Sequence, residues 1–322
     1  MRRYAWALLG FAVSAVAVYY FFRQAPPDLL QRVAERGNVF IVGAAILVPA
    51  YLIRAFKAWL VLNVGVNAVP GAAASLWVSI ALNNLLPLRL GDVLRIAYVG
   101  KTMKVGVIRT TAAVLVERIV DLFVILVLAA LVSFIVLGDQ FLPLLRDWIS
   151  TLPLFTIVPA VVALVVIVAI AMLIFRRLRA LIGSILGDLK PTAVRVALLL
   201  SASIVQWLLE ICLLGYITSQ LIGGIDGAQA ILSSFLSNLS TLVPSAPGYV
   251  GTFEVAGILP FQILTGRVAA EQSLFVFLYH LVIWLFSTCL GLMALVGLTI
   301  GGQMFRRSSV SQVLSGDEGA GK

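Results

Sequence analysis

The sequence is poor in the residues on which soluble domains, disulfide frameworks and metal sites depend. Only 11% of its 322 residues are charged, whereas soluble domains carry about a quarter. The two cysteines, Cys212 and Cys289, lie inside apolar runs, and His280 is the one histidine. We therefore expect no disulfide framework, no metal site and no cofactor. The chain is 61% hydrophobic with a mean hydropathy of +1.09, which predicts an all-α polytopic membrane protein.

Apolar runs of about 20 residues are long enough to cross the hydrocarbon of a bilayer. Six runs are predicted as full spans: 1–22, 38–60, 110–137, 152–175, 194–222 and 273–300. The first could pass for a signal peptide, but it lacks a good cleavage site and is predicted to be retained. Two further runs, 71–87 and 228–264, are broken by proline and glycine, and we predict re-entrant helical segments there. Counting them gives eight membrane segments.

The net charge of +9 comes from Lys and Arg at the ends of the apolar runs. This pattern sets orientation and attracts anionic lipid, so it does not indicate nucleic-acid binding. Both flanks of the run 71–87 are basic and are predicted to be cytoplasmic, whereas both flanks of 228–264 are predicted outside. We expect an inner-membrane protein with both termini cytoplasmic and a disordered tail over 306–322.

The chain reads as a single transmembrane domain over 1–322 with an internal repeat. The pattern Pro-x-x-x-Gly occurs at Pro87–Gly91 and again at Pro244–Gly248, an offset of 157 residues. The same offset brings the predicted spans of the first half onto those of the second. Because each half holds three full spans, the second copy would be inverted. We therefore predict inverted halves over 1–150 and 151–305, with the two broken segments bracketing a site near the midplane.

Three polar stretches interrupt the apolar runs: "NNLLPLRLGDVLR" at 83–95, "VLVERIVDLFVILVL" at 114–128 and "TLVPSAPGYVGTFE" at 241–254. Irregular backbone at membrane depth must be covered by protein or line a wet cavity. A helix that begins after such a turn directs N–H groups at an anion such as phosphate. The candidate substrate-binding residues are Asn83, Asn84, Pro87, Arg89, Gly91, Asp92, Arg95, Glu117, Arg118, Asp121, Pro244, Pro247, Gly248, Gly251 and Glu254.

Two interpretations of Glu117, Arg118 and Asp121 stay open. Charges inside a span are costly, so these three pair in a structural salt bridge or line a head-group cavity. Glu210 and His280 are weaker candidates; a buried carboxylate needs a partner or a proton, and a lone histidine is more often a packing residue. Two further basic residues, Arg54 and Lys57, are expected to extend to the membrane interface.

The three stretches resemble the flippase-like transmembrane domain of lysylphosphatidylglycerol synthases, which also occurs as a stand-alone protein. Its turn of the form Pro-x-Arg-x-Gly-(acidic)-x-x-Arg matches residues 87–95, with Asp92 in place of the usual Glu. Its Glu-Arg-x-x-Asp motif matches 117–121, and its Pro-x-Pro-Gly-Gly-x-Gly-x-x-Glu loop matches the stretch that ends at Glu254. Tyr249 replaces the second glycine of that loop and would narrow the approach of a ligand to its backbone.

The resemblance implies a lipid translocator that moves a phosphate-bearing lipid, either an anionic or aminoacylated phospholipid or a polyprenyl-phosphate-linked lipid. Arg89, Arg95 and Arg118 would contact the phosphate. Two alternatives stay open: a membrane-embedded glycosyl or acyl transferase with Glu117 or Asp121 as base, and a scaffold for a separate lipid-modifying enzyme. The stretch "VGKT" ends like a P-loop, but Arg95 stands where that motif requires glycine, and no catalytic residue is predicted.

Overall fold

The computed structural model describes residues 15–16, 18–23, 25–86, 89–103, 105–138, 192–221, 225–241 and 245–315, without the side chains at 133, 136, 137 and 301–315. Within these ranges all regular secondary structure is helical. The elements are α2 (Leu29–Ala34), α3 (Gly37–Leu62), η1 (Val66–Ala68), α4 (Val69–Leu85), α5 (Leu90–Thr102), α6 (Val107–Leu137), α9 (Ala193–Ser219), α10 (Gly227–Ser240), η4 (Pro247–Tyr249), α11 (Thr252–Thr265) and α12 (Ala270–Ser315).

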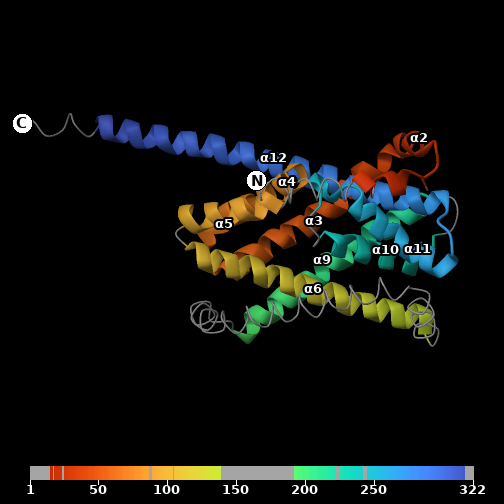
Figure 1. The fold of residues 1–322 in the computed structure, drawn as a ribbon. Coiled ribbons are helices and arrows are strands. Elements are labelled where there is room, and N and C mark those ends of the chain that lie inside the picture. The colour runs from red at the N-terminus through yellow and green to blue at the C-terminus, as the bar shows by residue number, and fades with distance from the viewer. Residues whose placement is uncertain are drawn as a thin grey trace, which may run out of the picture.

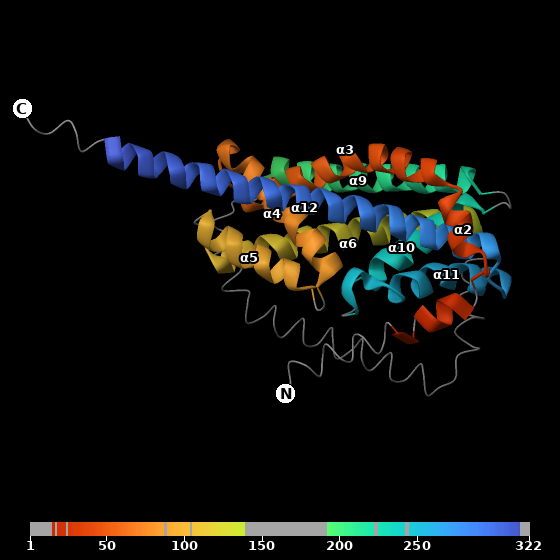
Figure 2. The same ribbon diagram turned by 90° about the horizontal axis from the view of Figure 1, so that it is seen from above.

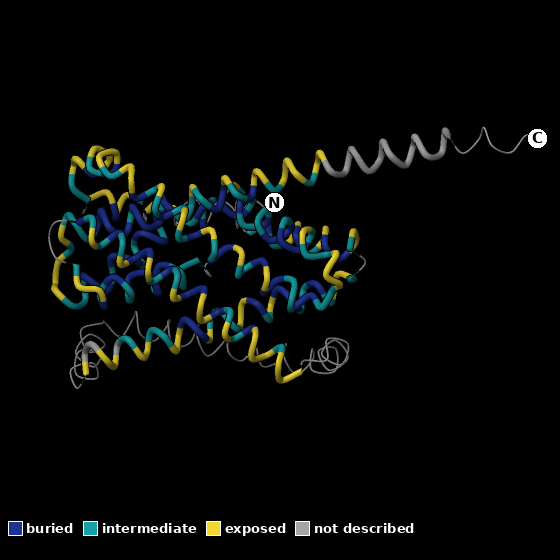
Figure 3. The backbone as a smooth tube through the Cα atoms, turned by 180° about the vertical axis from the view of Figure 1, so that it is seen from behind, coloured by how far each residue is buried: buried dark blue, intermediate teal, exposed yellow. Residues whose placement is uncertain are grey.

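The described helices have the length and surface of a multi-pass membrane protein. Four segments are long and apolar enough to cross a membrane: Gly37–Leu62, Val66–Leu85, Ala193–Ser219 and Ala270–Ile300. Large apolar side chains point outward, with Ile41 76% and Phe134 73% exposed. Figure 3 shows exposed positions along the outer faces of the helices and buried ones inside the bundle. Such an extensive apolar surface is stable in lipid and is not typical of a soluble monomer.

The helices agree with the predicted spans at 38–60, 194–222 and 273–300, and α6 covers the predicted span 110–137 as one helix of 31 residues. The predicted span 152–175 and most of 1–22 lie outside the described residues. The helical segment that contains the run 71–87 begins at Val66, so the expectation that this run is too short to cross was wrong on length; that the segment is re-entrant stays a prediction. Pro70 occupies the first turn of α4, where its missing N–H costs no hydrogen bond. At the other end, α12 extends to Ser315, so part of the predicted tail is helical.

Two helical hairpins, α4–α5 and α10–α11, approach each other in the middle of the bundle. In Figures 1 and 2, α5 lies at one end of the bundle and α10 and α11 lie at the other. The tip between α10 and α11, which contains η4, contacts α4. Helix α3 packs along α9, and α12 packs along α4. The bundle therefore gathers two irregular tips and the long helices around one central region.

The described helices repeat in the same order, because α3 to α6 and α9 to α12 each contain a long helix, a hairpin and another long helix. This order agrees with the 157-residue offset in the sequence. The inverted relation of the halves 1–150 and 151–305 stays a prediction, because residues 139–191 lie outside the described ranges.

A polar contact joins α2 to the start of α12. Arg32 donates to Asp28 at 2.8 Å and to Glu271 at 2.7 Å. The hydrogen bond from Arg32 holds the pKa of the Asp28 carboxyl below its ordinary value, because it stabilises the ionised form.

Candidate functional site

A cavity of about 180 Å³ lies where the hairpin tips meet the long helices. This volume is many times what one water molecule requires, and most of the lining side chains are polar, which suits a polar head group. The polar side chains of its lining are Tyr51, Arg54, Lys57, Asn83, Asn84, Arg89, Glu117, Arg118, Asp121, Trp207, Glu210, Asn238, Thr241, Tyr249, His280, Trp284 and Ser287.

Glu117, Arg118 and Asp121 of α6 are each paired with a residue on another helix. Arg95 donates two hydrogen bonds to Glu117, both 2.9 Å long. Arg118 donates to Asp92 at 3.2 Å. Glu117, Arg118 and Asp121 also line the cavity, so the structural and the cavity-lining interpretations both describe them.

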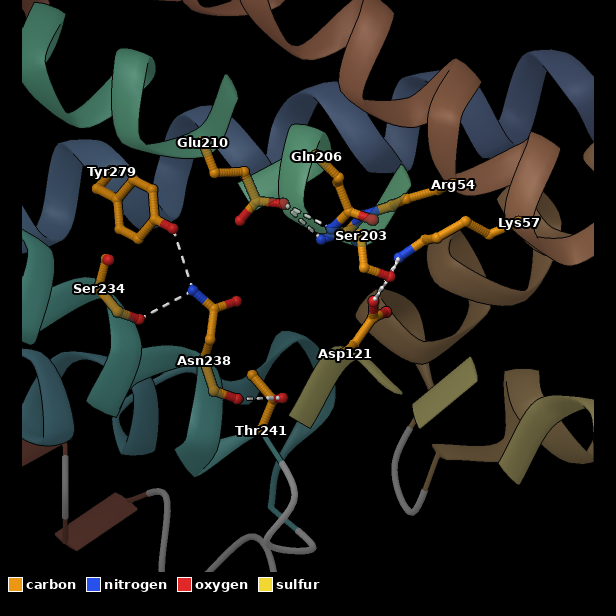
Figure 4. Close-up of polar contacts among 10 residues, drawn as sticks. All are labelled: Arg54, Lys57, Asp121, Ser203, Gln206, Glu210, Ser234, Asn238, Thr241 and Tyr279. Atoms are coloured by element: carbon orange, nitrogen blue, oxygen red, sulfur yellow. Dashed lines mark hydrogen bonds and ion pairs between the residues drawn. The ribbon is translucent and has the colours of Figure 1, made fainter. Parts of the chain in front are cut away.

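Asp121 pairs with Lys57 of α3, and Ser203 of α9 bonds to both (Figure 4). The side chain of Lys57 is only 3% exposed, so the prediction that it extends to the membrane interface was wrong. The physical reason is that the Asp121 carboxylate compensates the charge of the Lys57 ammonium in the interior, so the lysine side chain does not need to reach water.

Arg54, also expected at the interface, instead lines the cavity and donates to Glu210 at 2.7 Å. Its guanidinium lies 4.9 Å from the centre of the Tyr51 ring. Gln206 donates to the same Glu210 oxygen, as Figure 4 shows. Glu210 thus has the partner that its burial demands.

The first hairpin is held closed by hydrogen bonds between α4 and α5. Asp92 accepts from Ser79 at 3.0 Å and from the amide of Asn83 at 3.1 Å, and its own N–H donates to Asn83. Gly91 lies against α4 so closely that an added Cβ would come within 2.1 Å of the Ser79 carbonyl oxygen. Gly91 and Asp92 therefore close the hairpin and do not line the cavity.

Asn84 connects this hairpin to α12 by donating to Ser287 and Thr288, both at 2.9 Å. These bonds use both hydrogens of the Asn84 amide. Asn84 therefore fixes the end of α4 against the wall of the cavity.

The second hairpin tip is shaped by left-handed backbone. Gly248 has φ +68°, Tyr249 has φ +60° and Gly251 has φ +89°. Glu254 caps α11 by accepting from the Gly251 N–H at 2.7 Å, and its other oxygen bonds to His280. Glu254 therefore fixes the loop at Gly251 and the position of His280 on α12, and His280 in turn lines the cavity.

The two tips meet at Arg89. The guanidinium of Arg89 lies 5.5 Å from the centre of the Tyr249 ring, and the residue itself has φ +55°. Of the four cationic side chains in the described lining, Arg89 alone forms no ion pair with a carboxylate. Its Nε has no hydrogen-bond acceptor, and neither has the indole Nε1 of Trp284. A Cβ on Gly248 would lie 2.5 Å from that indole nitrogen, which places Trp284 directly behind the second tip.

The structure separates the predicted site residues into groups. Those that line the cavity are Asn83, Asn84, Arg89, Glu117, Arg118, Asp121, Glu210 and His280. Those outside the lining are Gly91, Asp92, Arg95, Pro247, Gly248, Gly251 and Glu254. Pro87 and Pro244 lie outside the described residues.

Sequence reasoning missed six lining residues. Arg54, Lys57, Trp207 and Trp284 lie on helices that it treated as plain spans, and Asn238 and Tyr249 lie in the second broken segment but were not predicted to bind a ligand. The two basic residues were visible as charges inside an apolar run, and that signal could have indicated buried ion pairs. The tryptophans give no such signal, because an aromatic residue in a span is common in packing.

The comparison with protein families covers most of the chain. A family model described as the lysylphosphatidylglycerol synthase TM region matches residues 7–291, which include both hairpins and every described residue of the cavity lining. No curated protein and no solved structure is significantly similar to the chain. The match over most of the length agrees with the three polar stretches, and the chain belongs to the family of the lysylphosphatidylglycerol synthase TM region.

Proposed function

We propose that the protein translocates a lipid with a phosphate-bearing head group between the leaflets of the membrane. The observation that carries this proposal is the environment of Arg89. It is a cation in a cavity inside a membrane protein, and it has no carboxylate partner. An uncompensated charge in such a place is costly, so a bound anion would stabilise it.

A phosphate group fits the donors that surround this position. Arg89 offers its guanidinium N–H groups, and the Trp284 indole N–H has no acceptor of its own. Arg118 lines the same cavity, and its side chain is 42% exposed although it pairs with Asp92. Arginine and phosphate form short charge-assisted hydrogen bonds, often two at once. Of the arginines predicted to bind phosphate, Arg95 is the exception, because Glu117 occupies its guanidinium.

The hairpins support translocation better than static binding. We infer that the α4–α5 hairpin enters from the cytoplasmic side and the α10–α11 hairpin from the outer side, so that their tips meet near the midplane. A head group held between two such tips could be released to either side when one hairpin moves, while the acyl chains stay in the bilayer. Paired broken segments around a central site are typical of transporters.

The transferase alternative needs a free carboxylate as base. Glu117 pairs with Arg95, and Asp121 pairs with Lys57 and Ser203. Carboxylates held in this way are poorly placed to accept a proton, so the geometry favours translocation. The scaffold alternative predicts that a lipid-modifying enzyme would co-purify with the protein.

The experiment is a lipid-exchange assay in liposomes. Purified protein is reconstituted with a fluorescent phosphodiester lipid, and a membrane-impermeant reductant reports how much label reaches the outer leaflet. We expect faster exchange than in empty liposomes, a loss of at least about tenfold in rate for Arg89→Gln, and a loss for Arg118→Ala.

The matched control is Arg267→Gln, which changes an exposed arginine outside the lining and should leave the rate unchanged. Equal rates for the wild-type protein and empty liposomes, across anionic phospholipids and a polyprenyl phosphate, would refute translocation. An Arg89→Gln variant as fast as wild type would refute the assignment of the phosphate site.

A further inference from the structure

A second group of lining residues, on α9 and α10, presents hydrogen-bond acceptors to the cavity. Glu210 is 2% exposed; its Oε1 accepts from Arg54 and Gln206, but its Oε2 has no partner. Asn238 donates from Nδ2 to the Ser234 carbonyl at 2.9 Å and to the Tyr279 hydroxyl at 3.1 Å. Figure 4 shows the free Glu210 oxygen and the Asn238 side-chain oxygen pointing into the same open space.

The orientation of the Asn238 amide is determined by its partners. A backbone carbonyl can only accept, so the atom that bonds to Ser234 must be the nitrogen. The side-chain oxygen therefore faces the cavity, which both Asn238 and Glu210 line. A carboxylate oxygen of Glu210 and the amide oxygen of Asn238 are therefore both directed at the molecule that occupies this part of the cavity.

The same region also contains donors without acceptors. The Nε of Arg54 and the indole Nε1 of Trp207 are buried and unpartnered, and both residues line the cavity. Trp207 is held in place by an edge contact with Phe235, whose ring centre lies 6.2 Å away. A ligand that satisfies this region must therefore donate and accept hydrogen bonds side by side.

Few chemical groups meet this requirement. A phosphate diester only accepts and an ammonium only donates, whereas a hydroxyl does both. The formal charges also disfavour an ammonium, since the carboxylates of Glu210 and Asp121 are already balanced by Arg54 and Lys57. A buried polar group left unpaired is costly, so a ligand that pairs all of them gains affinity.

We propose that Glu210, Asn238, Arg54 and Trp207 form a polyol subsite, which binds the hydroxyl groups of a sugar- or glycerol-type head group while its phosphate lies at Arg89. This inference rests on the proposed function and names the class of head group that the site selects. The polyol subsite gives Glu210 and Asn238 a contact with the ligand, in addition to the ion pair of Glu210 and the hydrogen bonds that Asn238 makes within the protein.

The test uses four short-chain phosphodiester lipids that share dihexanoyl tails and differ in head group. They are phosphatidylmethanol, phosphatidylglycerol, phosphatidylinositol and phosphatidylethanolamine, and calorimetry measures their dissociation constants with purified protein. We expect the glycerol and inositol lipids to bind at least about tenfold more tightly than the methanol lipid, because hydroxyls gain hydrogen bonds to an ionised carboxylate. The ethanolamine lipid should gain less.

Variants then locate the selectivity. Asn238→Leu and Glu210→Gln should reduce the preference for hydroxyls to about threefold or less, whereas Asn38→Leu, the same change on the exposed part of α3, should preserve it. Trp207→Phe removes the indole N–H and the five-membered ring but keeps an aromatic side chain beside Phe235, so it tests the indole donor even if the other variants misfold. Arg89→Gln should weaken all four lipids while leaving their ratios intact.

The outcomes distinguish this inference from the proposed function. If the methanol lipid binds in an Arg89-dependent manner but hydroxyls add nothing, the polyol subsite is refuted and the phosphate site stands. A clear preference for ethanolamine would replace the polyol subsite with an ammonium site. If no phosphodiester binds the wild-type protein, both proposals fail.

Discussion

Arg89 and Arg95 belong to the same short segment of chain, and the structure gives them opposite roles. Arg95 is 1% exposed at its side chain and donates two bonds to Glu117, whereas Arg89 faces the cavity without a carboxylate. We predict that Arg95→Gln destabilises the fold and that Arg89→Gln does not. The two changes remove the same charge by the same substitution, so each is the control for the other.

The magnitude follows from what each substitution leaves behind. Without Arg95, the Glu117 carboxylate stays buried without its ion-pair and hydrogen-bond partner, which costs about 3–5 kcal/mol. The side chain of Arg89 has no carboxylate to orphan, so its loss should change the free energy of unfolding by less than about 1 kcal/mol. Its loss should instead weaken phosphodiester binding about ten- to a hundredfold, the value of a charge-assisted hydrogen bond.

The assay is reversible unfolding of the purified protein from mixed micelles by increasing SDS, followed by circular dichroism, with lipid binding measured in parallel by calorimetry. The double variant Arg95→Met/Glu117→Met removes both charges and should recover most of the lost stability, because no ion is left unpaired. The reasoning is refuted if Arg95→Gln unfolds at the wild-type SDS concentration, or if Arg89→Gln is destabilised as strongly as Arg95→Gln.

Two further predictions concern the hairpin tips. Gly91→Ala places a Cβ within 2.1 Å of the Ser79 carbonyl oxygen and should destabilise the protein by about 1–3 kcal/mol in the same unfolding assay. The control is Gly37→Ala, whose Cβ meets no atom within 4 Å and which should leave the stability unchanged. Equal effects of the two variants would show that close packing at Gly91 is unimportant. Tyr249→Gly relieves the backbone strain at φ +60° but removes a ring that packs against the core, so the two effects oppose each other and the free energy of unfolding should change by less than about 2 kcal/mol. Calorimetry should show phosphodiester binding weakened by about two- to fivefold because Arg89 loses its ring contact; unchanged binding would contradict that role.

Much of the helical architecture was predictable, because lipid imposes a simple length rule on apolar runs. The predicted span 38–60 appears as Gly37–Leu62, and 194–222 appears as Ala193–Ser219. The predicted run 71–87 began two residues after the start of α4 at Val69, because a proline in the first turn, here Pro70, is compatible with a helix.

The candidate site was predictable only in part. The polar stretches indicated the hairpin tips and α6, and Arg89, Arg118 and Asn84 do line the cavity. The sequence could not separate Arg89 from Arg95, because both are arginines next to the same turn. Their difference depends on Glu117, which is 22 residues from Arg95 and within bonding distance of it only after α5 packs against α6.

What the sequence by itself determined is the class of protein and the location of its irregular segments. Composition and the spacing of apolar runs decide those features, because they follow from the cost of placing charge and unpaired backbone in lipid. The tertiary structure alone decided which charges are compensated. Lys57 meets Asp121 and Arg54 meets Glu210 across helices that are far apart in the chain, and these contacts leave Arg89 as the cation of the described lining that an anionic head group can pair.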